Sequence, residues 1–307
     1  MGLAAGGRRI PAFIRIASEC IRLVAVLIVV GFRPAPAGNQ ALLTGTYGGT
    51  LGAGGATAAE RSGFGQNPAA LRPGWFGAHA DFHRPYGMDE LRVAEAGVFA
   101  DGSRFGAAFE WRETGVDGLY DEQGFQACQV LRLGRARNGF PGALDLGLVW
   151  DRWSTLWPGG SGEVVWSHGF GAAWRMLPRL KAGAFVSGLP LEFDGIARTE
   201  RVLQWGLEGD SRDQGMVSTA RATLQILRLD FRKTGDTPWR ILASLSMSPH
   251  PAVEFTGGLA NPPFQVSLGI RVAWQGVEWH QALRYHRYLG RTWLSGLAYS
   301  RPFKEPG

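Results

Sequence analysis

Several features that define other classes of protein are scarce in this chain of 307 residues. It has two cysteines, Cys20 and Cys128, and only the second would remain after removal of an N-terminal leader. One cysteine can form neither an internal disulfide nor a cysteine metal site. Long apolar runs are also scarce. The run Leu23–Phe32 is about ten residues, and no other segment approaches the ~20 that a spanning helix needs. A transmembrane helix in the mature chain is therefore excluded.

Residues 1–37 are predicted to be a signal peptide. Arginines precede the apolar run, and Ala35-Pro36-Ala37 after it has the small-x-small pattern of a cleavage site. The alternative, a membrane anchor helix, fits less well because the run is too short. Export without a later spanning helix points to the periplasm or the outer membrane of a double-membraned bacterium.

The net charge of +6 gives no support for a nucleic-acid partner. The first 37 residues hold five arginines against Glu19, so most of the positive excess lies in the predicted leader. The rest of the chain is close to neutral and has no basic run interleaved with aromatic residues. A nucleic-acid-binding surface would need such a run.

The most informative pattern that is present lies in residues 264–274. Every second residue there is large and apolar: Phe264, Val266, Leu268, Ile270, Val272 and Trp274. Successive side chains on a strand point to opposite faces, so these six lie on one face and small or polar groups lie on the other. Similar segments recur from about residue 74 to 303, between short turns and Gly-rich loops. This recurrence is typical of an outer-membrane β-barrel.

We therefore predict an all-β fold, a closed antiparallel transmembrane β-barrel of about fourteen strands over residues 74–303. The expected strands are 74–84, 90–101, 103–113, 124–134, 142–153, 163–175, 179–189, 199–209, 216–232, 238–248, 250–259, 264–274, 276–288 and 290–303. Within 216–232 the apolar parity changes near Ile226, which predicts a β-bulge or two short strands. Tryptophans near strand ends, among them Trp75 and Trp153, are interpreted as girdles at the two membrane interfaces.

Charged residues on the polar faces are expected to line the lumen. Arg104, Glu110 and Arg112 share one parity of the third strand, and a charge facing lipid would cost ~2–4 kcal/mol at the midplane. Two other strands carry sets of the same kind: His79, Asp81 and His83, and Glu278, His280, Arg284 and His286. We favour paired, lumen-filling polar groups for these sets over ligand contacts or a metal site.

No catalytic chemistry or cofactor is expected. A Gly-x-Ser-x-Gly elbow between a strand and a helix is absent, and so are metal-ligand spacings of Cys and His. Ser167 and His168 are adjacent in sequence, so on a strand they face opposite ways. The chain is therefore not predicted to be an enzyme.

The segment Gly48–Leu71, GGTLGAGGATAAERSGFGQNPAAL, resembles the N-terminal region of FadL-type outer-membrane transporters and the related PorV/PorQ proteins. In that group a Gly/Ala-rich stretch leads to an Asn-Pro-Ala turn before the first strand, which here is Asn67-Pro68-Ala69. The resemblance implies a 14-stranded barrel in the bacterial outer membrane, with an N-terminal hatch, here residues 38–73. This chain is shorter than the typical fatty-acid transporter. It also continues past Phe303, whereas the barrel-assembly signal usually ends the chain with an aromatic residue.

The same resemblance implies non-covalent passage of a hydrophobic, fatty-acid-like small molecule, with movement of the hatch. The positions expected to take part are Gly48, Gly49, Gly54, Gly55, Asn67 and Pro68. The expected partners are outer-membrane lipid and the small molecule. The alternative, from the PorV/PorQ side, is a subunit or anchor that binds proteins of a secretion or surface-attachment system.

Overall fold

The computed structural model describes residues 67–71, 74–102, 104–116, 119–133, 142–160, 162–177, 179–190, 201–211, 219–230, 239–261 and 263–302. The predicted signal peptide, residues 1–37, lies outside this part of the chain. So do residues 38–66 of the predicted hatch, including Gly48, Gly49, Gly54 and Gly55.

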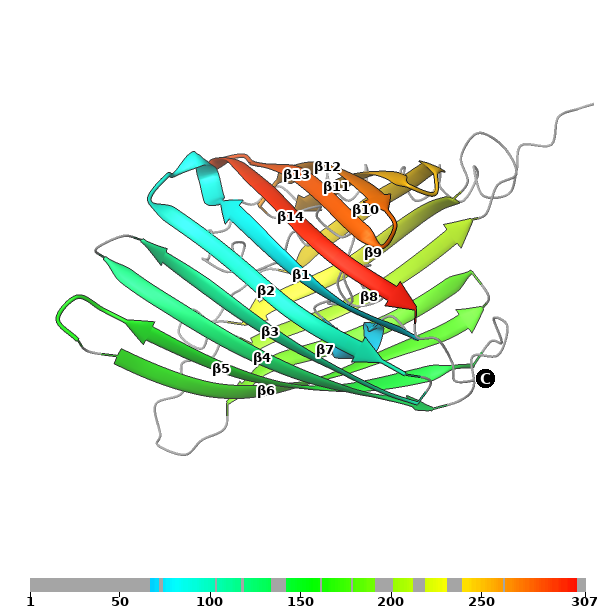
Figure 1. Ribbon diagram of the computed structural model, residues 1–307, viewed down its shortest axis with the longest axis horizontal. Helices are drawn as coiled ribbons and strands as arrows, with labels where there is room; N and C mark the ends of the chain where they lie inside the picture. The colour runs from blue at the N-terminus through cyan, green and yellow to red at the C-terminus, as the bar shows by residue number, and fades with distance from the viewer. Residues whose placement is uncertain are drawn as a thin grey trace, which may run out of the picture. The chain divides into compact units, whose positions relative to one another are not determined.

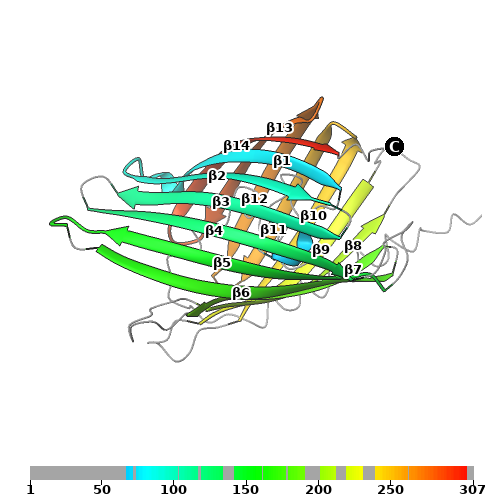
Figure 2. The same ribbon diagram turned by 60° about the horizontal axis from the view of Figure 1, so that its bottom comes forward.

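Fourteen antiparallel strands close into one barrel, as the sequence predicts. Each strand pairs with its neighbours in sequence, and β1 pairs with β14 to close the ring, as Figures 1 and 2 show. The strands are β1 (Trp75–Arg84), β2 (Leu91–Asp101), β3 (Phe105–Val116), β4 (Tyr120–Leu133), β5 (Leu144–Leu156), β6 (Gly162–Leu177), β7 (Leu180–Pro190), β8 (Arg201–Ser211), β9 (Thr219–Asp230), β10 (Arg240–His250), β11 (Val253–Asn261), β12 (Gln265–Trp274), β13 (Val277–His286) and β14 (Gly290–Pro302). Two short 3-10 turns accompany them, η2 (Pro68–Ala70) and η3 (Pro85–Gly87).

The barrel has its apolar side chains on the outside and its polar ones on the inside. In β12, Leu268 is 64% exposed and Trp274 72% exposed, whereas Ser267 and Arg271 are 1% and 3% exposed. This arrangement is the reverse of a soluble β domain and is what a barrel presents to lipid hydrocarbon. In the described part of the chain no helix is both long and apolar enough to cross a membrane.

Placing a charge on the outer face is expected to destabilise the barrel. Leu268→Lys puts an ammonium group on an apolar, outward position inside β12, and we expect a loss of ~2–4 kcal/mol in unfolding free energy. The matched control is Tyr288→Lys, which lies in the turn after β13 and should cost ~1 kcal/mol or less. Urea unfolding in lipid vesicles, followed by tryptophan fluorescence, measures both. Equal losses would contradict lipid contact at Leu268.

The two rims of the barrel differ in their connections. The terminal rim is the one where β1 begins and β14 ends, and the opposite rim is the one where β1 ends and β2 begins. The predicted tight turn Gln275-Gly276 lies at the terminal rim, and both residues have positive φ, 49° and 88°. Such a two-residue turn fits the twist of an antiparallel pair. Connections of five or more residues join β1 to β2, β5 to β6, β7 to β8 and β9 to β10 at the opposite rim, although connections of similar length also join β4 to β5 and β8 to β9 at the terminal rim.

The predicted break near Ile226 is wrong. β9 pairs with β8 and with β10 in uninterrupted register from Ala220 to Leu227. The apolar parity changes because Leu227 is buried inside the barrel, whereas Arg228 lies on the outward parity near the rim. There the guanidinium carbon of Arg228 lies over the Trp239 ring, 5.5 Å from its centroid, so the long side chain reaches the membrane interface.

Two tryptophans also differ from the predicted girdle. Trp75 packs against an apolar cluster inside the barrel. Trp153 shares the inward parity of Asp151 and lies against Gly124, where a Cβ would come within 2.7 Å of three ring atoms. Both residues lie close to strand ends, and sequence position alone does not distinguish the two faces there.

Candidate functional site: the barrel lumen

A belt of ionisable side chains lines the lumen of the described barrel from β11 through the β14–β1 junction to β5. On β3, Arg112 contacts Glu95 of β2 through Nε and Glu110 through a guanidinium nitrogen at 2.8 Å. On β12, Arg271 pairs with Glu254 at 2.9 Å and with Glu278 at 3.4 Å. All are largely buried, so each cation needs its carboxylates.

The junction between β14 and β1 is bridged by a hydrogen-bonded pair. Nε2 of His280 on β13 lies 2.7 Å from Oδ1 of Asp81 on β1, although β14 runs between these two strands. The pair can meet because Gly296 of β14 lies beneath it. A Cβ at Gly296 would come within 2.3 Å of both side chains. His79 lies 3.9 Å from the other oxygen of Asp81.

The structure brings some of the predicted lumen charges together and leaves one apart. Glu110 and Arg112 face inward and belong to one ion-pair network, as the parity of β3 predicts. Arg104 precedes the first residue of β3 and is exposed in the turn from β2. It is held there by backbone pairing, because its carbonyl accepts a hydrogen bond from the Arg132 N–H at 2.9 Å. Arg104 is therefore a rim residue and not part of the lumen network.

The Asn-Pro-Ala turn is docked on the inner wall of the barrel, where Figures 1 and 2 show η2 as a short blue segment. Asn67 is fully buried, and its Nδ2 donates to the carbonyls of Ala172 and Ala184 at 3.0 and 3.2 Å. Its Oδ1 accepts from the Ala69 N–H at 3.0 Å and so caps the turn. One asparagine thus ties the segment to β6 and β7.

Glycines in the wall make room for this turn. A Cβ at Gly147 of β5 would lie 2.4 Å from the Ala69 nitrogen and 2.7 Å from the Pro68 carbonyl carbon. A Cβ at Gly171 of β6 would also overlap the Asn67 side chain. Both glycines share the inward parity of their strands, so the wall is recessed where the turn lies.

A third contact uses a residue that sequence reasoning did not single out. Arg132 of β4 donates to the Leu71 carbonyl at 2.8 Å and pairs with both Asp101 and Asp145. The sequence does contain one indication of its role: Arg132 is a charged residue at an inward position of predicted strand 124–134, two residues after Val130. The partners come from three other parts of the chain, so strand parity could not reveal the contact.

Next to this segment the lumen wall is apolar. The Leu71 cluster consists of buried side chains from η2's flank and from β2 to β5 and β7: Leu71, Phe99, Ala108, Cys128, Val130, Val149 and Phe185. The lumen therefore has an apolar region beside the docked segment and a polar belt elsewhere. The segment covers apolar wall that would otherwise face the interior of the barrel.

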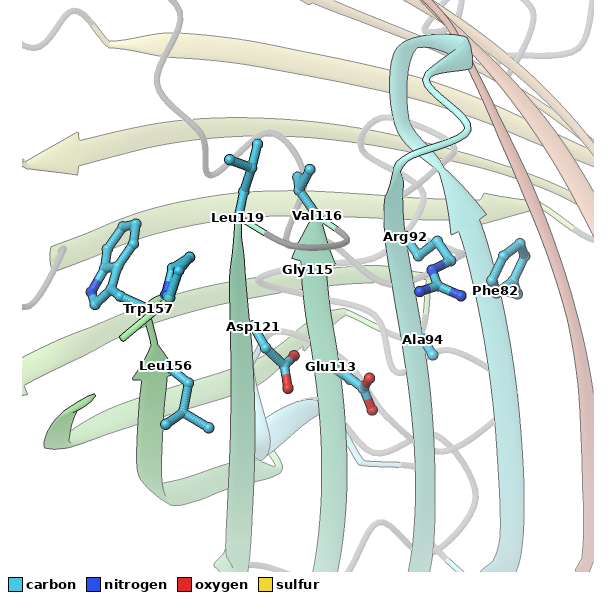
Figure 3. Close-up of a pocket in the computed structure, with 11 residues that line it drawn as sticks. Phe82, Arg92, Ala94, Glu113, Gly115, Val116, Leu119, Asp121, Leu156 and Trp157 are labelled. Carbon is cyan, nitrogen blue, oxygen red and sulfur yellow. The ribbon is translucent and has the colours of Figure 1, made fainter. Parts of the chain in front are cut away.

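A separate groove of about 580 Å³ lies on the outer face of the barrel at the opposite rim, where residues of β1 to β5 line it. Figure 3 shows its apolar walls, Phe82, Leu156 and Trp157, and its charged groups, Arg92, Glu113 and Asp121. Charged and aromatic side chains together are usual where a barrel wall passes from hydrocarbon to the polar interface. The groove contains none of the predicted site residues.

The histidine and serine positions agree with their predicted faces. His79, Asp81 and His83 are all buried on the inward face of β1. Ser167 is buried inside the barrel. His168 faces outward and packs edge-on against Phe170, with the two ring centroids 5.5 Å apart. Within the described residues no group of three or more His, Cys, Asp or Glu side chains is placed to hold a metal ion.

Comparisons with known proteins bear on the fold. No protein-family model matches the sequence. No curated protein matches it significantly. Among solved structures, the toluene transporter TodX of Pseudomonas putida is similar, with a TM-score of 0.51 and 9% identity over 83% of this chain and 96% of that one. The CymD monoaromatic hydrocarbon channel gives a TM-score of 0.50 and 12% identity over 86% and 98%. At these identities the likeness shows the fold alone, and the resemblance to FadL-type and PorV/PorQ proteins stays a prediction.

Proposed function

We propose that this protein is an outer-membrane channel that passes small hydrophobic molecules, with its N-terminal segment acting as a hatch. The main observation behind this proposal is that the segment Asn67–Leu71 is docked on a recessed wall beside the apolar Leu71 cluster. The outward apolar face supports residence in a bilayer. The barrel-like neighbours include two hydrocarbon channels, which supports passage of small molecules as the general role.

The proposed mechanism is non-covalent. A hydrophobic solute, fatty-acid-like in its chain, binds the Leu71 cluster when the hatch moves away from the wall. Asn67 and Pro68 are the proposed hinge of this movement, and Gly48, Gly49, Gly54 and Gly55 are its proposed flexible positions. The last four lie outside the described residues, so only the hinge end can be argued from contacts.

Asn67→Ala is expected to weaken docking of the hatch. The substitution removes two hydrogen bonds to the wall and the cap on Ala69. A loss of ~1–3 kcal/mol would raise the undocked fraction by about 5- to 150-fold. The measurement is the rate at which N-phenyl-1-naphthylamine, a small apolar dye, enters cells whose outer membrane holds the protein. Expression of the wild type should speed entry over a vector control, and Asn67→Ala should speed it further. Asn261→Ala on β11 is the matched control.

A polar reporter separates the alternatives. If the polar β-lactam nitrocefin enters faster and the apolar dye does not, the barrel is a general porin and the proposal fails. If neither enters and a stoichiometric protein co-purifies from native membranes, the PorV/PorQ-like role as a secretion or attachment subunit takes its place.

A further inference from the structure

Two arginines face outward from the barrel wall close to the opposite rim. Arg152 lies four residues before the end of β5 and shares the outward parity of Trp150. Arg228 lies two residues before the end of β9 and shares the outward parity of Ile226. The two places are separate, because Arg152 borders β6, Arg228 lies between β8 and β10, and β7 runs between them. A charge that faces hydrocarbon is costly, so each arginine needs a partner or polar surroundings.

Each guanidinium lies against a tryptophan ring. The guanidinium carbon of Arg152 is 5.7 Å from the ring centroid of Trp166, its register partner on β6. That of Arg228 is 5.5 Å from the centroid of Trp239, whose ring packs on Trp205 with 5.3 Å between centroids. All three indole rings are exposed on the outer face. A guanidinium stacked in this way keeps its N–H edges available to an acceptor, and little ordering remains to be done when a ligand binds.

No carboxylate in the described part of the chain neutralises either group. Neither Arg152 nor Arg228 forms an ion pair with a described aspartate or glutamate, and among the described residues Nε of Arg228 is buried without a hydrogen-bond partner. Arg84, at the same rim, is different. It lies over the Phe82 ring at 5.8 Å but pairs with Asp89 at 3.1 Å. Arg152 and Arg228 therefore share the stacking of Arg84 but not its counter-charge.

The height of Arg152 on the wall matches the boundary between hydrocarbon and lipid head groups. Between it and the terminal rim, the outward residues of β5 are Trp150, Leu148, Leu146 and Leu144. The eight steps from Leu144 to Arg152 on a tilted strand span about 20 Å along the membrane normal, close to the apolar band of about 25 Å that such barrels present. Arg152 therefore lies where this apolar column ends, at the level of lipid phosphates.

The outer face at this rim is divided by charge. The groove on β1 to β5 carries the carboxylates of Glu113 and Asp121 beside Arg92, as Figure 3 shows, and is unsuited to an anion. The sector from β5 to β10 carries Arg152 and Arg228, each stacked on an indole. Charge complementarity therefore favours an anionic head group in the second sector and disfavours it in the first.

We propose that Arg152 and Arg228 each bind the phosphate of a lipid in the leaflet that surrounds the opposite rim. Trp166 and Trp239 hold the two guanidiniums in place. Each guanidinium donates two parallel hydrogen bonds to the phosphate, and the acyl chains lie along the apolar wall below it. Lipid bound in this way fixes the height of the barrel in the membrane. The inference goes beyond the proposed function, because passage of a solute through the lumen does not need it.

Phosphatidic acid and phosphatidylcholine with the same acyl chains test the proposal, because they differ in the charge of the head group. Native mass spectrometry of the full chain in nonionic detergent counts the lipids bound at each lipid concentration. The wild type should bind two molecules of phosphatidic acid more tightly than any phosphatidylcholine. Arg152→Gln and Arg228→Gln should each weaken one of these two roughly tenfold, and the double variant should weaken both. Arg152→Lys should keep part of the affinity, because the charge remains but the planar fork is lost. The matched control is Arg84→Gln, because Arg84 already has a carboxylate partner.

Each variant is first checked for the shift in gel mobility between cold and boiled SDS, which reports an intact barrel. A glutamine variant that does not fold is replaced by the lysine substitution at the same position. The two lipid sites are wrong if the folded variants bind phosphatidic acid like the wild type, or if Arg84→Gln weakens it equally. If millimolar inorganic phosphate displaces phosphatidic acid, the ligand is a soluble anion and not a lipid. Entry of the apolar dye tests the proposed function separately from all of these outcomes.

Discussion

Replacing Arg132 with methionine is expected to lower the unfolding free energy of the barrel by about 3–5 kcal/mol. The side chain of Arg132 is 7% exposed and pairs with Asp101, whose side chain is 0% exposed, and with Asp145. Methionine fills a similar volume but leaves the Asp101 carboxylate buried without its cation. The same change removes the hydrogen bond to the Leu71 carbonyl. Urea unfolding in vesicles measures the loss.

Two comparisons isolate the buried charge. Adding Asp101→Asn to Arg132→Met removes the stranded carboxylate, so the double variant should recover much of the loss. Arg84→Met breaks an exposed pair with Asp89, whose side chains are 57% and 83% exposed, and should cost ~1 kcal/mol or less. A double variant no more stable than Arg132→Met would show that lost packing, and not buried charge, dominates.

Gly147→Val is expected to push the docked segment off the inner wall while leaving the barrel closed. The first side-chain carbon alone would lie 2.4 Å from the backbone nitrogen of Ala69, and backbone cannot rotate away as a side chain can. A penalty of ~3 kcal/mol would raise the undocked fraction roughly a hundredfold. The readout is the rate at which maleimide labels Ala70→Cys, which replaces a residue that is 8% exposed. The background carries Cys20→Ala and Cys128→Ala.

Gly257→Ala is the matched glycine substitution for that experiment. A Cβ there would have its nearest contact at 3.8 Å, with a side-chain carbon of Leu268. Labelling should therefore stay slow in this control and become fast in Gly147→Val. Slow labelling in both, with cold-SDS mobility intact, would mean that the recess at Gly147 is not what holds the segment.

The barrel was largely predictable because its alternation is a local signal. The pattern of 264–274 predicts β12 and its lipid face, and shared parity predicts that His79, Asp81 and His83 point inward. Strand parity is unreliable near the rims, where a long side chain such as Arg228 can face outward and still reach polar surroundings. The error near Ile226 arises in this way. Trp153 was misplaced for another reason: it was assigned to the girdle from its position near a strand end, although it shares the inward parity of Asp151.

The site was less predictable because its contacts join distant parts of the chain. Nothing in the neighbourhood of Arg132 indicates that Leu71 and Asp101 will be its partners. The role of Asn67 was suggested by a short motif, but its acceptors, Ala172 and Ala184, lie more than a hundred residues away. Such contacts depend on barrel curvature and strand tilt, which a single sequence does not display.

The bond between His280 and Asp81 also has a kinetic meaning. Its two residues are 199 positions apart in the chain and lie on either side of β14. No partly built sheet in which β14 still has a free edge can contain it, because β14 must already be paired with both β13 and β1. Contacts of such long range form late in folding, after the loop between them has been closed. The pair therefore forms when the barrel closes. Its strength affects the rate at which the β1–β14 pairing reopens more than the rate at which the barrel assembles.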